Sequence, residues 1–183
     1  QAGCALQCTF CATGAQGFEQ DLTSDEIIGQ LWLANFHKKN KDLITNVVFM
    51  GMGEPLLNFD AVVESAKIMK HQLAYGLSRK RVTISTSGIV PQIDKLADSV
   101  DVSLAISLHS ADNSLRDEIV PINKKYPINS LMNSCKNYLL NYDNKRNITI
   151  EYILIDGVND SIAHAKQLSK LLTNISCKIN LIP

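Results

Sequence analysis

The sequence predicts a parallel α/β fold, built either as a doubly wound sheet or as a barrel. Short runs of β-branched and apolar residues alternate along the chain with segments of helical periodicity. No internal repeat or low-complexity linker separates them, and 45% of the 183 residues are hydrophobic, which suits a packed core. We expect residues 1–183 to form a single domain, because this length is typical of one.

Five strands are expected, at residues 44–50, 81–87, 102–109, 148–155 and 178–182. Helical patterns lie between them at residues 23–36, 58–71, 91–97, 129–140 and 160–172. The first helical pattern opens with Thr23 and Glu26, spaced as in a capping box. Right-handed crossovers place the carboxyl ends of all parallel strands on one rim, where ligands of such folds bind. Residues that end a strand are therefore candidates for a functional site.

Charge and composition exclude several classes of protein. The chain has 18 Lys plus Arg against 18 Asp plus Glu, so a strongly basic nucleic-acid-binding arm is not visible at the level of the whole chain. The basic runs at 79–81 and 38–41 lack interleaved aromatics, which makes them weak candidates for RNA contacts. No apolar run approaches the roughly 20 residues that span a bilayer, and the start does not resemble a signal peptide. Because the chain lacks an initiator Met, we expect a piece of a longer protein.

Three cysteines, Cys4, Cys8 and Cys11, form a Cys-x3-Cys-x2-Cys loop near the start of the chain. Three soft thiolates on a short loop suit an iron–sulfur cluster, and a four-iron cluster would keep one iron open to a substrate or cofactor. The alternative is a structural zinc site in a non-catalytic module, although zinc usually takes four ligands and no second pair follows. Five cysteines, an odd number, favour a reducing, cytoplasmic location over a disulfide framework. Cys135 and Cys177 are expected to be small buried hydrophobic residues.

Two carboxylates lie in or next to the predicted strands. Gly53 and Glu54 follow the first strand, where glycine allows close approach of a ligand and Glu54 can accept a hydrogen bond from an ammonium group. A tight strand-to-helix turn explains the same residues equally well. Glu151 lies within a strand, where a buried carboxylate must be paired, and we expect a basic neighbour such as Lys178 to do so.

Small hydroxyl residues follow a period of two near the ends of the central strands. Ser85 shares a face of its strand with its neighbours two residues away, and Ser107 and His109 share a face of the next strand. These residues leave room for a ligand, although serines more often satisfy local backbone groups, and a single histidine is more often packed than catalytic. Asn180 points away from its apolar neighbours in the last strand and needs a polar partner.

Six segments occur in an order that resembles a known family. The segments are Gly3-Cys-Ala-Leu-Gln-Cys-Thr-Phe-Cys11, Gly51-Met-Gly-Glu-Pro-Leu-Leu-Asn58, Ser85-Thr-Ser-Gly88, Leu104-Ala-Ile-Ser-Leu-His109, Arg116-Asp-Glu-Ile-Val-Pro-Ile-Asn-Lys-Lys125 and Cys177-Lys-Ile-Asn-Leu-Ile-Pro183. With these segments the chain resembles, over essentially its whole length, the radical S-adenosylmethionine methyltransferases of RNA, the RlmN/Cfr family.

The resemblance implies a partial (βα)6 TIM-like barrel, with five of its strands in this chain, and two cofactors, a [4Fe-4S] cluster and S-adenosylmethionine. Cys4, Cys8 and Cys11 would hold the cluster. Gly53 and Glu54 would meet the methionine end of S-adenosylmethionine. The sulfonium and adenosine parts would be held by Ser85, Ser107, Leu108, His109 and Asn180.

The resemblance also implies a reaction, methylation of adenine C2 in 23S ribosomal RNA and in tRNA, with a flavodoxin-type electron donor. A 5′-deoxyadenosyl radical would activate a methyl group carried on a cysteine in a segment beyond the last strand. No catalytic residue is therefore expected within this chain, and neither Cys135 nor Cys177 matches the family's catalytic cysteines. An adenine-C8 methyltransferase and a radical enzyme with a different substrate are the alternatives, and the oligomeric state is left open.

Overall fold

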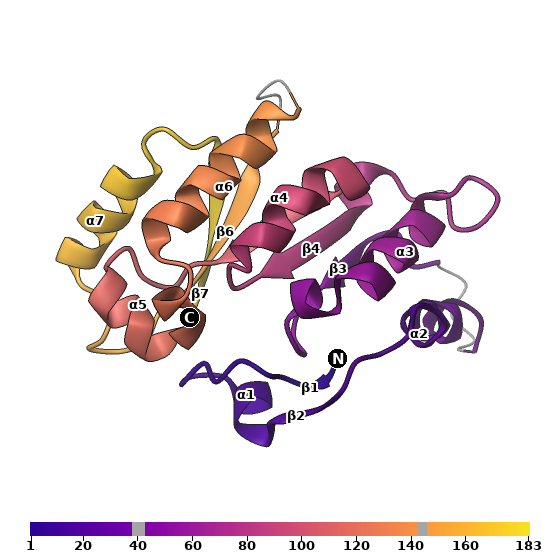
Figure 1. The fold of residues 1–183 in the computed structure, drawn as a ribbon, viewed down its shortest axis with the longest axis horizontal. Helices are drawn as coiled ribbons and strands as arrows, with labels where there is room; N and C mark the ends of the chain where they lie inside the picture. Colours follow the sequence, from indigo (N-terminus) through magenta and orange to yellow (C-terminus); the bar gives the residue numbers. More distant parts are fainter. Residues whose placement is uncertain (38–42, 143–145) are drawn as a thin grey trace.

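The main sheet contains five parallel strands whose spatial order follows their order in the sequence. We describe residues 1–37, 43–142 and 146–183 from a computed structural model (Figure 1). The strands are β3 (Val47–Phe49), β4 (Val82–Thr86), β5 (Ser103–Ser107), β6 (Ile148–Ile153) and β7 (Cys177–Ile182). A doubly wound sheet would reverse its strand order at a switch point, whereas the order β3-β4-β5-β6-β7 is the singly wound arrangement of a barrel.

Helices precede and separate these strands, in the alternation that the sequence predicted. They are α2 (Ser24–Phe36), α3 (Phe59–Lys70), α4 (Val90–Ser99), α5 (Asn113–Ile119), α6 (Ile128–Leu140) and α7 (Ile162–Leu172), with 3-10 turns η1 (Pro55–Asn58), η2 (Arg79–Arg81) and η3 (Pro121–Lys124). The capping box at the start of α2 is present, with the Thr23 backbone N–H donating to Glu26 Oε2 at 2.9 Å. Figure 1 shows α4 and α6 side by side against the sheet.

Several elements were not predicted from the sequence. They are α1 (Ala12–Gln16), the antiparallel pair β1 (Ala2–Gly3) and β2 (Phe18–Gln20), and α5. All are short, and elements of this length depend on tertiary contacts more than on local propensity.

The strand predicted at 102–109 ends at Ser107, because His109 takes a left-handed backbone conformation with a φ of 59°.

The two faces of the sheet differ in chemistry, as the period-two pattern predicted. The register aligns Ile84 with Leu104 and Ile106 with Ile150, and this apolar face is buried beneath the helices in the hydrophobic core. On the opposite face, Ser85 aligns with Ala105 and carries its hydroxyl towards the carboxyl ends of the strands. A face lined with small polar residues is left available for a ligand.

The basic runs lie away from the carboxyl rim or outside the described residues. Residues 79–81 form η2 at the amino end of β4, opposite the rim where the cysteine loop lies. The run at 38–41 falls outside the residues that the structure describes. None of the described helices has both the length and the apolar character needed to cross a bilayer.

Candidate functional site

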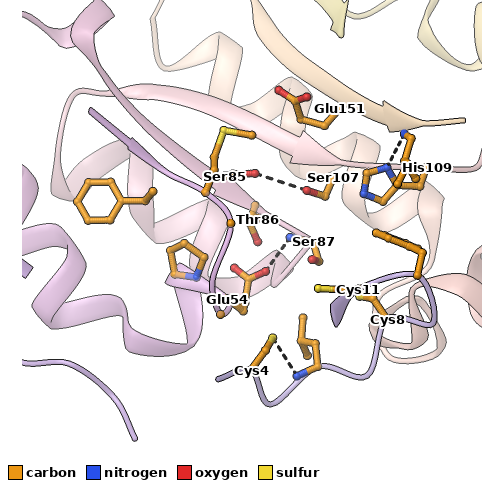
Figure 2. Close-up of a pocket in the computed structure, with 18 of the residues that line it drawn as sticks. Cys4, Cys8, Cys11, Glu54, Ser85, Thr86, Ser87, Ser107, His109 and Glu151 are labelled. Carbon is orange, nitrogen blue, oxygen red and sulfur yellow. Dashed lines mark hydrogen bonds between the residues drawn. The ribbon is translucent and has the colours of Figure 1, made fainter. Parts of the chain in front are cut away.

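A cavity of about 260 Å³ lies at the carboxyl rim of the sheet, between the cysteine loop and the ends of the strands (Figure 2). The loop and the strand ends meet there although they are far apart in sequence, since both Cys4 and Ile182 line the cavity. Most of the predicted site residues line this cavity. They are Cys4, Cys8, Cys11, Gly53, Glu54, Ser85, Ser107 and His109.

The cysteine loop is held in place by backbone hydrogen bonds. The Cys4 N–H donates to Gly17 O at 2.9 Å, and the Cys11 N–H closes a turn on Cys8 O at 3.1 Å. The Cys4 Sγ accepts the Leu6 N–H at 3.4 Å, a contact of the kind that tunes thiolate clusters. Gly3 has a φ of 72°, and a Cβ there would lie 1.9 Å from Gly17 O, so only glycine fits before Cys4.

The thiols of the loop are partly or fully shielded from solvent. Burial, together with the nearby Cys11 and Cys4, raises the pKa of Cys8 to about 11. A bound metal would reverse this, because a coordinated thiol loses its proton outright. Uptake of metal by these thiols would therefore release protons and rigidify the loop.

The donor set of this loop, three cysteine thiols within eight residues, fits an iron–sulfur cluster. A cluster presents several iron atoms, so its cysteine ligands surround a cavity without meeting, and Cys4, Cys8 and Cys11 all line one.

Glu54 lies at the edge of the cavity and is buried. Its Oε1 accepts the Leu56 N–H at 3.0 Å, and its Oε2 accepts the Ser87 N–H at 2.7 Å. Burial raises the pKa of this carboxyl, while the two backbone hydrogen bonds oppose the shift. A carboxylate can accept about four hydrogen bonds, so Glu54 can also accept one from an ammonium group of a ligand.

Ser85 and Ser107 face each other across neighbouring strands at the floor of the cavity (Figure 2). Their hydroxyl oxygens are 3.5 Å apart. A hydroxyl at a strand end can serve only to hydrogen-bond a nearby backbone group. This is the case for the adjacent Thr86, whose Oγ1 accepts the Gly88 N–H at 3.0 Å. The two serines have no such backbone partner among the described residues, so their hydroxyls can bind a ligand.

His109 is packed and lines the cavity as well. Its Nδ1 accepts the Ile153 N–H at 3.1 Å, and its ring meets Phe10 of the cysteine loop edge to face, with the centroids 4.8 Å apart. Burial, together with the charge of Arg116, lowers the pKa of His109 to about 4. The ring is therefore neutral at pH 7, and Nδ1 is an acceptor.

Two of the predicted site residues do not line the cavity. The Leu108 side chain is fully buried in the hydrophobic core on the apolar face. Asn180 is exposed on β7, and its Nδ2 donates to Glu151 Oε2 at 2.6 Å. This amide partners Glu151, which lines the cavity, in place of the Lys178 expected from the sequence.

The two remaining cysteines lie away from this site. Cys135 is fully buried in α6, and burial raises its pKa to about 12. Cys177 begins β7 at the amino end of the sheet, on the opposite side from the cavity, and packs against the core. Cys135 is buried as expected, whereas Cys177 is only partly buried.

Arg116 and Asn159 stabilise the rim and were not singled out from the sequence. Arg116 is fully buried and donates to backbone carbonyls at the ends of β4 and β5. Asn159 is buried as well, and its Nδ2 donates to His109 O and Ile153 O. The sequence could have indicated that Arg116 is buried, because its spacing places it on the same helical face as the apolar Ile119 and Val120.

Comparison with known families agrees with this architecture. The sequence profile of the Radical SAM superfamily matches residues 1–168. The chain therefore belongs to the Radical SAM superfamily, whose members use an iron–sulfur cluster and S-adenosylmethionine. The strand order and the position of the cysteine loop are consistent with that assignment.

The chain is also similar in sequence to individual curated proteins. The chain is 56% identical over its whole length to proteins named "Dual-specificity RNA methyltransferase RlmN" from Pseudomonas entomophila and Pseudomonas putida. It spans about half the length of these curated relatives, 50% and 49%.

Solved structures show the same fold. The crystal structure of a radical SAM methyltransferase from Sphaerobacter thermophilus matches all of this chain and 54% of its own, with a TM-score of 0.95 and 43% identity. Streptococcus suis SuiB, solved with S-adenosylmethionine, has a TM-score of 0.65 at 17% identity, with 100% of this chain and 39% of SuiB covered. At that identity the likeness concerns the fold alone.

Proposed function

We propose that this chain is the cofactor-binding core of a radical S-adenosylmethionine methyltransferase that acts on RNA. The observation that carries the proposal is the convergence of Cys4, Cys8 and Cys11 with Glu54 and the strand-end residues on one cavity. The identity of 56% to proteins named as RNA methyltransferases supports the same class of substrate. In this proposal the target is adenine C2 in ribosomal RNA and tRNA, the electron donor is of the flavodoxin type, and the location is cytoplasmic.

Each group of residues has a separate role in this proposal. Cys4, Cys8 and Cys11 hold a [4Fe-4S] cluster, which supplies one electron for the reductive cleavage of S-adenosylmethionine. Glu54 accepts a hydrogen bond from the amino group of the methionine end, and Gly53 lets that end approach the backbone. The positive charge of the ligand would stabilise the Glu54 carboxylate, whose pKa burial raises.

The strand ends would bind the rest of the cofactor. Ser85 and Ser107 present hydroxyls 3.5 Å apart, suited to the polar edge of the adenosine part. His109 and Phe10 close one side of the cavity with aromatic rings and exclude water from it. Leu108 and Asn180 would act indirectly, Leu108 through its backbone and Asn180 through Glu151.

The experiment that tests this function has two stages. The complete protein is reconstituted anaerobically with iron and sulfide, reduced in the presence of S-adenosylmethionine and assayed for 5′-deoxyadenosine. Product that disappears in Cys8→Ala, but persists in Cys177→Ser, supports the radical core. Zinc without acid-labile sulfide in the purified protein would refute it in favour of a structural metal site.

The second stage identifies the target. The reconstituted protein is incubated with ribosomal RNA or tRNA, and the digested nucleosides are separated by mass spectrometry. 2-Methyladenosine would support the proposed reaction. 8-Methyladenosine would place the protein in the other branch of the family, and 5′-deoxyadenosine formation without RNA methylation would indicate a different substrate.

A further inference from the structure

Arg116 is a charged side chain in the interior with neutral hydrogen-bond partners. It lies in α5 and is fully buried. Its Nε donates to Leu108 O at 2.9 Å, its Nη1 to Asn123 Oδ1 at 2.8 Å, and its Nη2 to Ser87 O at 2.6 Å and Ser107 O at 3.1 Å. Among the described residues, no carboxylate accepts a hydrogen bond from this guanidinium. Its positive charge is therefore solvated by dipoles and is not cancelled by an ion pair.

The acceptors of Arg116 belong to the rim that carries the cavity. Ser87 follows β4, and Ser107 and Leu108 end β5, so one planar guanidinium ties two neighbouring strand ends together. Ser87 also donates its N–H to Glu54 Oε2 at 2.7 Å. The position of Glu54 is thereby coupled to the strand ends that Arg116 holds.

The same helix holds the cysteine loop. The Thr9 N–H, between Cys8 and Cys11, donates to Ile119 O at the end of α5, at 3.2 Å. Arg116 precedes Ile119 by about one turn of this helix, so its charge lies in the element that contacts the cysteine loop. Burial lowers the pKa of Arg116 only to about 10, so the guanidinium remains protonated at pH 7.

We propose that Arg116 is a positioning residue that locks the carboxyl ends of β4 and β5 and provides a fixed positive charge behind the cysteine loop. This inference rests on the proposed function. A cluster bound by three thiolates is anionic and gains a further negative charge on reduction, so an uncancelled cation nearby favours the reduced state. Hydrogen bonds to three carbonyls keep Ser87, Ser107 and Leu108 in register for S-adenosylmethionine.

Two substitutions separate the positive charge of Arg116 from the hydrogen bonds that its planar guanidinium donates. Arg116→Met removes both, and Arg116→Lys keeps a positive charge but loses the planar set of donors. Lys124→Met is the matched control, since it removes an exposed cation from the neighbouring η3. The complete protein is reconstituted anaerobically, and the midpoint potential of the cluster, the Kd for S-adenosylmethionine and the melting temperature are measured.

We expect Arg116→Met to lower the ratio of reduced to oxidised cluster at a fixed potential by about tenfold, or about 59 mV for a one-electron couple. Arg116→Lys should stay close to the wild type at pH 6 and approach the methionine variant at higher pH, because a buried lysine loses its proton readily. A role in folding alone would not produce this pH dependence. Both variants should bind S-adenosylmethionine about tenfold more weakly, and Lys124→Met should match the wild type.

Hydrogen exchange of the cluster-free protein provides a readout that does not require the cofactor. Amides at 86–89 and 107–110 should exchange about tenfold faster in both Arg116 variants than in the wild type or Lys124→Met. A wild-type potential together with unchanged exchange would overturn the inference. A wild type that forms no iron–sulfur cluster would refute the proposed function, while the exchange rates would still decide whether Arg116 fixes the strand ends. If Arg116→Met does not bind the iron–sulfur cluster, the pH dependence of the cluster's midpoint potential in Arg116→Lys decides the role of the charge.

Discussion

The Glu54 carboxylate accepts the backbone N–H of Ser87 at 2.7 Å, across 33 residues of sequence. This hydrogen bond joins the turn after β3 to the end of β4 at the lip of the cavity. Because Glu54 is buried, the bond exchanges little with water and fixes the direction in which the carboxylate faces the ligand. The predictions below test how this rim depends on individual side chains.

Glu54→Gln should weaken binding of S-adenosylmethionine by tenfold or more and destabilise the protein by about 1–3 kcal/mol. The amide has the size of the carboxylate but no charge, and its NH2 group must face the N–H of either Leu56 or Ser87. Calorimetric titration and urea unfolding measure the two effects. The exposed Asp60→Asn is the control, and equal affinities in the two variants would contradict the assigned role.

Cys8→Ala should lower the iron and sulfide content by at least about tenfold, because even changes in groups behind a metal ligand cost that much affinity. Cys177→Ser should keep the wild-type content, since Cys177 lies at the opposite end of the sheet. Chemical analysis of iron and acid-labile sulfide after reconstitution measures both. Equal losses in the two variants would mean that the cysteine loop is not the cluster site.

Gly3→Ala should displace Cys4 from its position in the cysteine loop. The new Cβ would clash with Gly17 O at 1.9 Å, and the φ of 72° is unfavourable for alanine. We expect loss of cluster binding and a lower melting temperature. Gly29→Ala is the matched control, since it lies in α2 with open space around its Cβ position and should stabilise the protein by about 1 kcal/mol. Cluster content and melting temperature are measured for both, and wild-type cluster binding in Gly3→Ala would contradict the prediction.

Protonation of His109 should lower the free energy of unfolding as the pH falls from about 6.5 to about 4. Its pKa is near 6.5 in the unfolded chain and about 4 in the folded one, so the unfolded state binds more protons in this range and gains stability. The difference between these two pKa values limits the loss to about 3 kcal/mol.

His109→Asn isolates this contribution. Asparagine tolerates the left-handed φ of 59°, and its Oδ1 can accept the Ile153 N–H that Nδ1 accepts, but it does not titrate. Urea unfolding of the cluster-free proteins at pH 7.0, 5.5 and 4.5 should show the wild type losing stability relative to the variant. A constant difference between the two proteins would show that the histidine titrates normally in the folded state.

The alternation of strands and helices could be predicted from the sequence because it depends on local periodicity. The apolar positions around Ile84, Leu104 and Ile150 repeat every second residue, and the structure buries them together. The start of α2 was predictable because Thr23 and Glu26 satisfy each other within one turn. The spacing of Cys4, Cys8 and Cys11 predicted a metal-binding loop for the same reason, since the three cysteines lie within eight residues.

Short elements and long-range partners required the tertiary structure. The two-residue β1 and the seven-residue α5 carry too few residues for a periodic signal, and their neighbours determine whether they form. The partner of Glu151 was expected to be Lys178, but the register places the Asn180 amide 2.6 Å from its carboxylate. A sequence pattern predicts that a buried carboxylate needs a partner and does not predict which one.

By itself, the sequence determined the type of each main element, the apolar and polar faces of the sheet, and the cysteine loop, because these depend on residues within one or two turns of each other. Local periodicity left a doubly wound sheet and a barrel open, and the tertiary structure decided for the singly wound order and brought Glu54, Ser85 and His109 to one cavity with the cysteines. It also decided that Arg116 is buried behind them. These features depend on which strand ends meet, and packing of the whole sheet sets that geometry.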